Sequence, residues 1–521
     1  MASRSHKKRP SRRPYEVSDK ELRRNRKRIQ NLFSLLLIVA FIVIVILLLK
    51  AIMHGRADRT SSEGPSLHER LKAALKFAEG PPPEPPDTFE GLLDINQDTM
   101  VIDQYFTYGT HLYFSGSYNT LPQVVQAEAV VRPINEALDV GAWTMWLETD
   151  EEDGGVTHFC AADGITTGPD LDQIPAGKYA LLMKLTAANG DVQYRFIKDE
   201  SHNQPFDYYT VTRNGSNRKI QMKTMTDTVH GFTFFGIEVE ETELPEDIYD
   251  FVIDPGHGGT DEGCLSRDEK VKEADLVLEI GLKTKELLEA HGYKVLMTRD
   301  GTEDPSEEMA YTMYAENGRV NKACRSRAKM GLSIHIDESS YDSERGFSVT
   351  GTIRDDWSFN LPKKLVSSIR NHTKAVFWDE EVGNVKDGIY YGAYDGFMVD
   401  GTFNNRDAFY MIRELGGVAT GAMYDGNYEY YVGENQFRNS LQGVECDLVT
   451  LGFMTNDDDL KDIMGNKDTY AEALAEALDS MIRDAPILSL ETAPKAIPSA
   501  QARQAEKEAN GESTESTEPD K

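Results

Sequence analysis

The chain contains few cysteines. Its 521 residues include only Cys160, Cys264, Cys324 and Cys446. A disulfide scaffold needs a much higher density of cysteine, so that class of small exported protein is excluded. The spacing of the four residues also matches no cysteine-based zinc motif. One or two incidental disulfides and buried thiols both remain compatible with the sequence.

Positive charge is scarce outside the amino terminus. Residues 1–30 hold twelve Lys and Arg against three Asp and Glu, a net charge of +9, so the total of −31 leaves −40 for the remainder. An acidic body of this kind is not attracted electrostatically to anionic polymers. We therefore expect no nucleic-acid partner.

Charge is absent altogether from one long apolar run. Residues 32–49 are 18 uncharged residues, which at a rise of 1.5 Å per residue approach the thickness of a hydrocarbon core of about 30 Å. No small-x-small cleavage site follows at residues 50–54, which favours a membrane anchor over the alternative of a cleaved signal peptide. The sequence predicts a transmembrane helix over 31–53. The positive-inside rule places the basic segment 1–30 in the cytoplasm and the rest of the chain outside the cell membrane.

Composition divides the part after this helix into two further regions. Residues 54–88 form a linker that ends in the proline run 80–86, which predicts an extended spacer. Residues 89–245 are rich in short Val, Tyr, Phe and Thr runs between turn residues, which predicts an all-β, sandwich-like domain. The expected strands are Met100–Phe106, His111–Phe114, Trp143–Leu147, Tyr179–Leu185, Val192–Ile197, Tyr208–Thr212 and Phe232–Val239.

From residue 248 the hydrophobic period changes. The pattern predicts, in order, a strand at 251–254, a helix at 273–290, a strand at 294–298, a helix at about 306–330 and a strand at 332–336. This alternation is typical of a parallel sheet covered on both faces. A core strand at 447–451 and a helix capped by Asp468 follow, and the polar tail 490–521 is expected to be disordered.

Two histidines follow expected parallel strands. His257 lies in Ile253-Asp254-Pro255-Gly256-His257-Gly258-Gly259, and His335 ends Leu332-Ser333-Ile334-His335. Loops at the carboxyl ends of parallel strands carry the chemistry of open α/β sheets. A catalytic zinc ion takes three His or carboxylate ligands and keeps a position for water. Spacing does not choose the third ligand among the nearby acids, which are Glu262, Glu269, Glu273 and Glu279.

These motifs resemble, in the same order, those of the zinc-dependent N-acetylmuramoyl-L-alanine amidases. The further matching segments are Lys272-Glu273-Ala274-Asp275-Leu276, Thr298-Arg299, Arg319 and Leu451-Gly452-Phe453-Met454-Thr455-Asn456. The resemblance covers 248–486 and implies a three-layer α/β domain with a parallel-rich sheet. It also implies one zinc ion bound by His257, Glu273 and His335, and hydrolysis of the amide between the lactyl group of N-acetylmuramic acid and L-alanine in peptidoglycan.

One position departs from the family. The family places a general-base glutamate two residues before the glycine of the Gly-Phe pair, which is Thr450 in this chain. A threonine hydroxyl is no base near pH 7, so the catalytic base is unassigned. Asp337, where the family usually has Asn, adds a charge near the metal. An amidase and a degenerate pseudo-amidase, which binds peptidoglycan or regulates wall hydrolases, therefore both remain. A zinc carboxypeptidase fits the motif order less well.

The segment 340–440 is longer than the core fold requires and is rich in aromatic residues. Aromatic rings stack on sugars, so these residues are candidates for a glycan-binding wall, although the favoured alternative is that they form the small core of an inserted subdomain. A third hypothesis is that the segment covers the metal until a regulatory membrane or wall protein displaces it. The aromatics concerned are Tyr390, Tyr391, Tyr394, Phe397, Phe403, Phe409, Tyr410, Tyr424, Tyr428, Tyr430, Tyr431 and Phe437.

Overall fold

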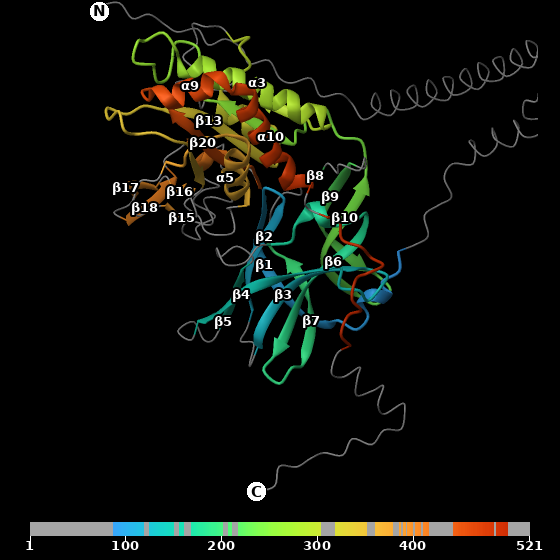
Figure 1. Cartoon of the computed structure of the whole chain (residues 1–521). Coiled ribbons are helices and arrows are strands. Elements are labelled where there is room, and N and C mark those ends of the chain that lie inside the picture. The colour runs from blue at the N-terminus through green and yellow to red at the C-terminus, as the bar shows by residue number, and fades with distance from the viewer. Residues whose placement is uncertain are drawn as a thin grey trace, which may run out of the picture. The chain divides into compact units, whose positions relative to one another are not determined.

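The computed structural model describes two folded regions between residues 87 and 498 (Figure 1). It leaves out 119–123, 151–155, 161–167, 202–206, 211–216, 304–317, 352–359, 379–384, 416–440, 484–485 and short gaps within 387–409. The predicted basic segment, membrane helix and nearly all of the linker lie outside the described residues. Among the residues that are described, no helix has the length and apolar character needed to cross a membrane.

The first region is a closed ring of seven strands. The strands are β1 (Asn96–Tyr108), β2 (His111–Tyr118), β3 (Val124–Pro133), β4 (Gly141–Asp150), β5 (Val156–Cys160), β6 (Gly177–Ala187) and β7 (Val192–Asp199). They pair in the order β1-β2-β5-β4-β3-β6-β7, and β7 pairs with β1 in parallel to complete the ring. The prediction of a sandwich-like domain is therefore wrong, because β7 bonds to β6 on one side and to β1 on the other and leaves no two separate sheets.

Three more strands extend this sheet from β6. They are β8 (Asp207–Thr210), β9 (Arg218–Asp227) and β10 (Phe232–Glu241), and two short helices, η1 (Glu90–Leu92) and η2 (Leu171–Gln173), complete the region. All seven predicted strands are found, and β3, β5 and β9 were not predicted. Along the first half of β9, buried residues alternate with partly exposed ones, as expected for a strand with one face in the core.

The second region is built on a mixed, mostly parallel sheet. Its strand order is β12-β11-β13-β20-β14-β16-β15, and the first four strands are parallel. The strands are β11 (Phe251–Pro255), β12 (Val295–Met297), β13 (Met330–Asp337), β14 (Ser348–Gly351), β15 (Val385–Lys386), β16 (Ile389–Tyr391) and β20 (Glu445–Phe453). Every residue of β11 is buried, which is typical of a strand covered on both faces.

Helices cover both faces of this sheet. The longer helices pack with alternate strand residues such as Phe251 and Ile253 in one core, whereas Val252 belongs to a second core with residues of the two short helices. The first group contains α3 (Glu273–Ala290), α5 (Asn360–His372), α9 (Asp457–Gly465) and α10 (Lys467–Arg483), and the second contains α4 (Arg319–Arg325) and α6 (Tyr410–Leu415). The expected three-layer arrangement is confirmed, and Figure 1 shows α3, α9 and α10 beside β13 and β20.

Two predictions need correction at their boundaries. The helix expected to reach Met330 ends at Arg325, because Ser326 caps α4 and β13 begins at Met330. The tail expected to be disordered from residue 490 is ordered as far as residue 498. Leu488 N donates to Gln173 O (2.8 Å) and Ala496 N to Ala137 O (2.8 Å), and small apolar side chains of this segment pack on the cores of the first region.

Part of the segment 340–440 belongs to the main sheet, and another part lies outside it. Among its described residues, β14, β15 and β16 join the main sheet and α5 packs on it, whereas β17 (Ala393–Val399) and β18 (Thr402–Asp407) form a separate hairpin. The chain then returns through β19 (Gln442–Gly443), which pairs in parallel with the end of β1 before β20 begins. The first region thus contacts the chain directly before the strand that carries Thr450.

Candidate metal centre

His257, Glu273 and His335 meet at the carboxyl end of the parallel strands. His257 lies two residues after β11, His335 is on β13, and Glu273 is the first residue of α3. Gly256 permits this approach, because a Cβ atom at that position would lie 2.2 Å from Cε1 of His335. The backbone of His257 has a φ of 60°, an uncommon value for a residue with a side chain. The turn therefore brings the end of β11 directly against the ring of His335.

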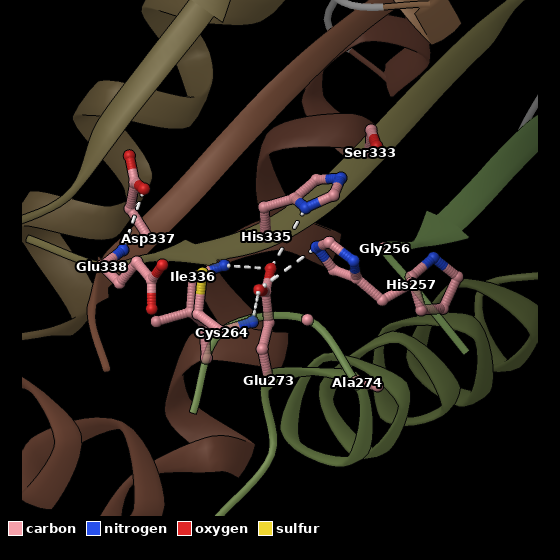
Figure 2. A network of polar contacts seen from close by, with 12 residues as sticks. Gly256, His257, Cys264, Glu273, Ala274, Ser333, His335, Ile336, Asp337 and Glu338 are labelled. Atoms are coloured by element: carbon pink, nitrogen blue, oxygen red, sulfur yellow. Dashed lines mark hydrogen bonds and ion pairs between the residues drawn. The ribbon is translucent and has the colours of Figure 1, made fainter. Parts of the chain in front are cut away.

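The carboxylate of Glu273 lies between the two imidazole rings (Figure 2). His257 Nε2 is 3.2 Å from Glu273 Oε2, and His335 Nδ1 is 3.1 Å from Glu273 Oε1. The backbone N–H groups of Cys264 and Ile336 also donate to this carboxylate, each at 2.8 Å. Glu273 is fully buried, whereas the two histidine side chains are 26% and 27% exposed. The group is rigid on the protein side and accessible from solvent.

Electrostatics favours the charged form of the carboxylate. Burial alone would raise the pKa of Glu273, but hydrogen bonds from His257 and His335 and their positive charge lower it well below its usual range. Burial likewise would lower the pKa of His257, but Glu273 and Asp261 raise it overall. Because a metal ligand must offer a lone pair, an ionised Glu273 is the form that can bind a cation.

The donor set fits zinc. One atom from each of the three side chains lies within 4.8 Å of the others, and among the described residues they form the group that could hold a metal ion. Two imidazole nitrogens and one carboxylate oxygen are typical of catalytic zinc, which keeps a fourth position open. The other acids weighed from the sequence lie in different contacts: Glu262 pairs with Lys272, and Glu279 pairs with Lys467.

Buried charges support the loop that carries His257. Asp254 accepts hydrogen bonds from Thr298 Oγ1 (2.5 Å), Ser333 Oγ (2.7 Å) and Arg319 Nη1 (3.2 Å). Burial would raise the pKa of Asp254, but Arg319 and the two hydroxyls lower it overall. Arg299 donates to the carbonyls of Pro255 and Gly256 at 2.9 and 2.7 Å.

Arg319 continues this support to the ligand itself, because its guanidinium donates to the carbonyls of Pro255 (3.1 Å) and His257. The sequence placed both arginines in motifs but gave them no role. It also gave no role to Asp261, whose Oδ2 lies 2.9 Å from Nδ1 of His257. The signal that could have found Asp261 is its position four residues after the histidine.

Thr450 lies directly beside His335. The two residues are paired in register on β20 and β13, so their side chains leave the same face of the sheet. The pairing runs without interruption from Glu445 to Thr450, and the register shifts only beyond it. A bulge that would bring Asp447 or Glu445 to the metal is therefore absent from this strand pair. Both acids are buried earlier along β20.

An aromatic cluster includes Phe453, which lies three residues after Thr450 on β20. The ring of Trp378 is 6.2 Å from those of Phe453 and Tyr390, and its Nε1 donates to Glu344 (2.7 Å). Phe453 is opposite Asp337 in the strand register. Tyr390 thus packs with a neighbouring aromatic side chain, and the later aromatics of the predicted wall have side chains outside the described residues.

Comparison with known proteins gives the same assignment for this region. The Amidase_3 model, N-acetylmuramoyl-L-alanine amidase, matches residues 251–394. The amidase AmiC of Neisseria meningitidis serogroup B is 40% identical over 98 residues, which are 19% of this chain and 21% of that protein. The germination-specific amidase of Bacillus subtilis is 32% identical over 90 residues, which are 16% of this chain and 37% of that protein. The chain thus spans about a fifth to two fifths of the length of these relatives.

One of the solved structures to which this chain is similar is also that of an amidase. The alignment with the amidase AmiC2 of Nostoc punctiforme covers 46% of this chain and 99% of that chain, at 21% identity and a TM-score of 0.30. A score this low adds nothing to the assignment. The family match contains all three residues of the His-Glu-His group and ends before Thr450. Residues 251–394 of this chain belong to the N-acetylmuramoyl-L-alanine amidase family.

Proposed function

We propose that the chain is a zinc-dependent N-acetylmuramoyl-L-alanine amidase that hydrolyses the lactyl-L-alanine amide of peptidoglycan during wall remodelling. The observation that supports this most strongly is the convergence of His257, Glu273 and His335 within a domain of that family. We assign these three residues as the ligands of one zinc ion. When bound, the ion supplies Lewis-acid activation of water and of the amide carbonyl.

The side chains around the proposed zinc position provide charge and access, but no base beside His335. Glu273 holds both histidines by hydrogen bonds and brings the negative charge that a dication requires. The two histidines are partly exposed, so a peptide amide can approach them from solvent. What the site lacks beside His335 is a carboxylate on β20, where Thr450 offers only a hydroxyl.

The missing carboxylate limits the expected rate. General acid-base catalysis typically contributes about 100- to 10,000-fold, because a proton must leave the water and return to the leaving amine. We therefore propose slow turnover for the wild-type chain. The second candidate function, a pseudo-amidase that binds peptidoglycan or regulates wall hydrolases, is favoured by the same position, Thr450.

One experiment separates the two functions. Purified protein is loaded with zinc and incubated with peptidoglycan, and the release of L-alanine amino termini is followed for the wild type and for His257→Ala. Release by the wild type that disappears in the variant supports the amidase. Equal background release from both proteins, with zinc bound to the wild type, supports the pseudo-amidase.

We further propose a membrane anchor at residues 31–53, with 1–30 in the cytoplasm and the amidase domain outside. The uncharged run 32–49 and the basic residues before it support this placement. Peptidoglycan is then within reach, and a regulatory membrane or wall protein is a possible partner for the β-rich region. Protease digestion of intact spheroplasts tests the orientation, since the proposed topology requires cleavage after residue 53 and protection of residues 1–30.

A further inference from the structure

Asp261 contacts the side of His257 that faces away from Glu273. Its Oδ2 is 2.9 Å from Nδ1 of His257, while Nε2 of the same ring is 3.2 Å from Glu273 Oε2. We propose that Asp261 is the positioning residue that fixes the ring orientation and tautomer of His257 for metal binding. This inference rests on the proposed zinc site, and it concerns a residue that does not itself touch the metal position.

Two hydrogen bonds hold the backbone of Asp261 in place. Gly258 N donates to Asp261 O at 2.8 Å, and Asp261 N donates to Gly258 O at 3.1 Å. This pair of bonds closes a tight loop directly after His257. The carboxylate therefore starts from a defined place, and little conformational freedom is lost when it meets the imidazole.

The two carboxylate oxygens serve two different donors. Oδ1 accepts from the backbone N–H of Gly263 at 3.1 Å, and Oδ2 faces His257 Nδ1. An ionised carboxylate only accepts hydrogen bonds, so the Nδ1 that faces Asp261 must keep its hydrogen, and Nε2, on the side of Glu273, is the nitrogen left to bind the metal. Carboxylates that hold a metal-binding histidine in this way typically strengthen metal affinity by 10- to 100-fold.

His257 is also held from its main chain. Arg319 donates to the carbonyl oxygen of His257. The φ of 60° at this histidine is uncommon, and such values persist where the surroundings determine them. Arg319 thus fixes where the residue is, and Asp261 fixes how its ring is turned.

Asp261→Asn separates a positioning role from a purely structural one. An amide has one oxygen, so it can accept from Gly263 N–H or from His257 Nδ1–H, but not from both in this geometry. If Asp261 only shapes the loop, the asparagine replaces it fully, since the Gly263 bond survives. If Asp261 positions the ring, the amide NH₂ faces Nδ1 and favours the wrong tautomer.

The measurement is zinc affinity by competition with a chelator, with the melting temperature of the zinc-free protein as the test of folding. We expect Asp261→Asn to bind zinc about 10- to 100-fold more weakly with an unchanged melting temperature. The matched control is Asp268→Asn, because Asp268 is an exposed acid of the same loop that bonds to Ser266 and Lys270. The control should bind zinc as the wild type does.

Wild-type affinity in Asp261→Asn would overturn the inference. If that variant does not fold, ¹⁵N NMR of the histidines in the zinc-loaded wild type decides instead: hydrogen on Nδ1 of His257 supports the proposal, and hydrogen on Nε2 contradicts it. Neither readout depends on turnover. A protein that binds zinc as expected but releases no L-alanine amino termini would therefore refute the amidase function and leave the role of Asp261 standing.

Discussion

The two sides of the candidate site differ in how completely they are built. On the side of β11, α3 and β13, three side chains of the right chemistry converge, and buried arginines and backbone N–H groups hold them in place. On the side of β20, the residue beside His335 is Thr450. The family match includes the first side and ends before the second. In the proposed amidase site, metal binding and proton transfer belong to different elements, so one can change while the other is kept.

The largest effect on zinc affinity is expected from removing the negative charge of Glu273. Glu273→Gln keeps the shape of the side chain but removes the negative charge that both histidines contact. We expect zinc affinity to fall by more than about 100-fold, beyond the range typical of supporting residues. Glu262→Gln is the control, because Glu262 is partly exposed and pairs with Lys272. Stoichiometric zinc in purified Glu273→Gln, measured by atomic emission, would show that the metal lies elsewhere.

The next largest effect is expected from the buried Asp254–Arg319 pair, which supports the loop that carries His257. Asp254→Ala removes the buried partner of Arg319 and leaves a buried cation without its carboxylate. Breaking such a pair typically costs about 3–5 kcal/mol, and urea unfolding measures this loss in the free energy of unfolding. Asp247→Ala breaks the exposed Asp247–Arg327 pair and should cost less than about 1 kcal/mol. Similar losses in both variants would contradict the account of a specially supported metal loop.

A smaller, pH-dependent effect is expected at the start of β20. Burial, and then the charge of Asp170, raise the pKa of Glu445 from 4.5 to about 8. Because the folded state binds this proton more tightly than the unfolded state, the free energy of unfolding falls as pH rises from 4.5 to about 8. The fall is at most about 1.4 kcal/mol per pH unit.

Glu445→Gln tests this contribution by denaturant unfolding at pH 6, 7 and 8. The variant should lose most of the slope between pH 6 and 8. A smaller slope below pH 6 should persist, because burial also raises the pKa of Asp170 to about 6. An unchanged slope between pH 6 and 8 in the variant would mean that Glu445 does not titrate in this range.

Much of the amidase region could be predicted from local pattern. The apolar run 251–254 and the helical period from Glu273 to Ala290 produced β11 and α3 nearly at their observed bounds. The choice of Glu273 among four acids could not be made from spacing, because all four lie close together in the sequence between positions 262 and 279. It came from the order of the motifs, and the first turn of α3 explains it physically.

Long-range contacts account for what the sequence did not predict. The ring of strands closes through the pairing of β7 with β1, whose paired residues are about a hundred positions apart in the chain, and no local period encodes such a partner. The ordered tail depends on backbone bonds to Gln173 and Ala137, which its polar composition does not show. Asp261 was missed for a similar reason, since its role appears only when the ring of His257 is placed.

The central claim is that the metal site is complete and that the proton acceptor beside it has been replaced. The direct test is the rate of L-alanine amino-terminus release from peptidoglycan by zinc-loaded wild type, Thr450→Val and Thr450→Glu. The account predicts that Thr450→Glu is about 100- to 10,000-fold faster than the wild type, with unchanged zinc affinity, and that Thr450→Val is no slower than the wild type. A Thr450→Glu variant that binds zinc normally and is no faster than the wild type would contradict it.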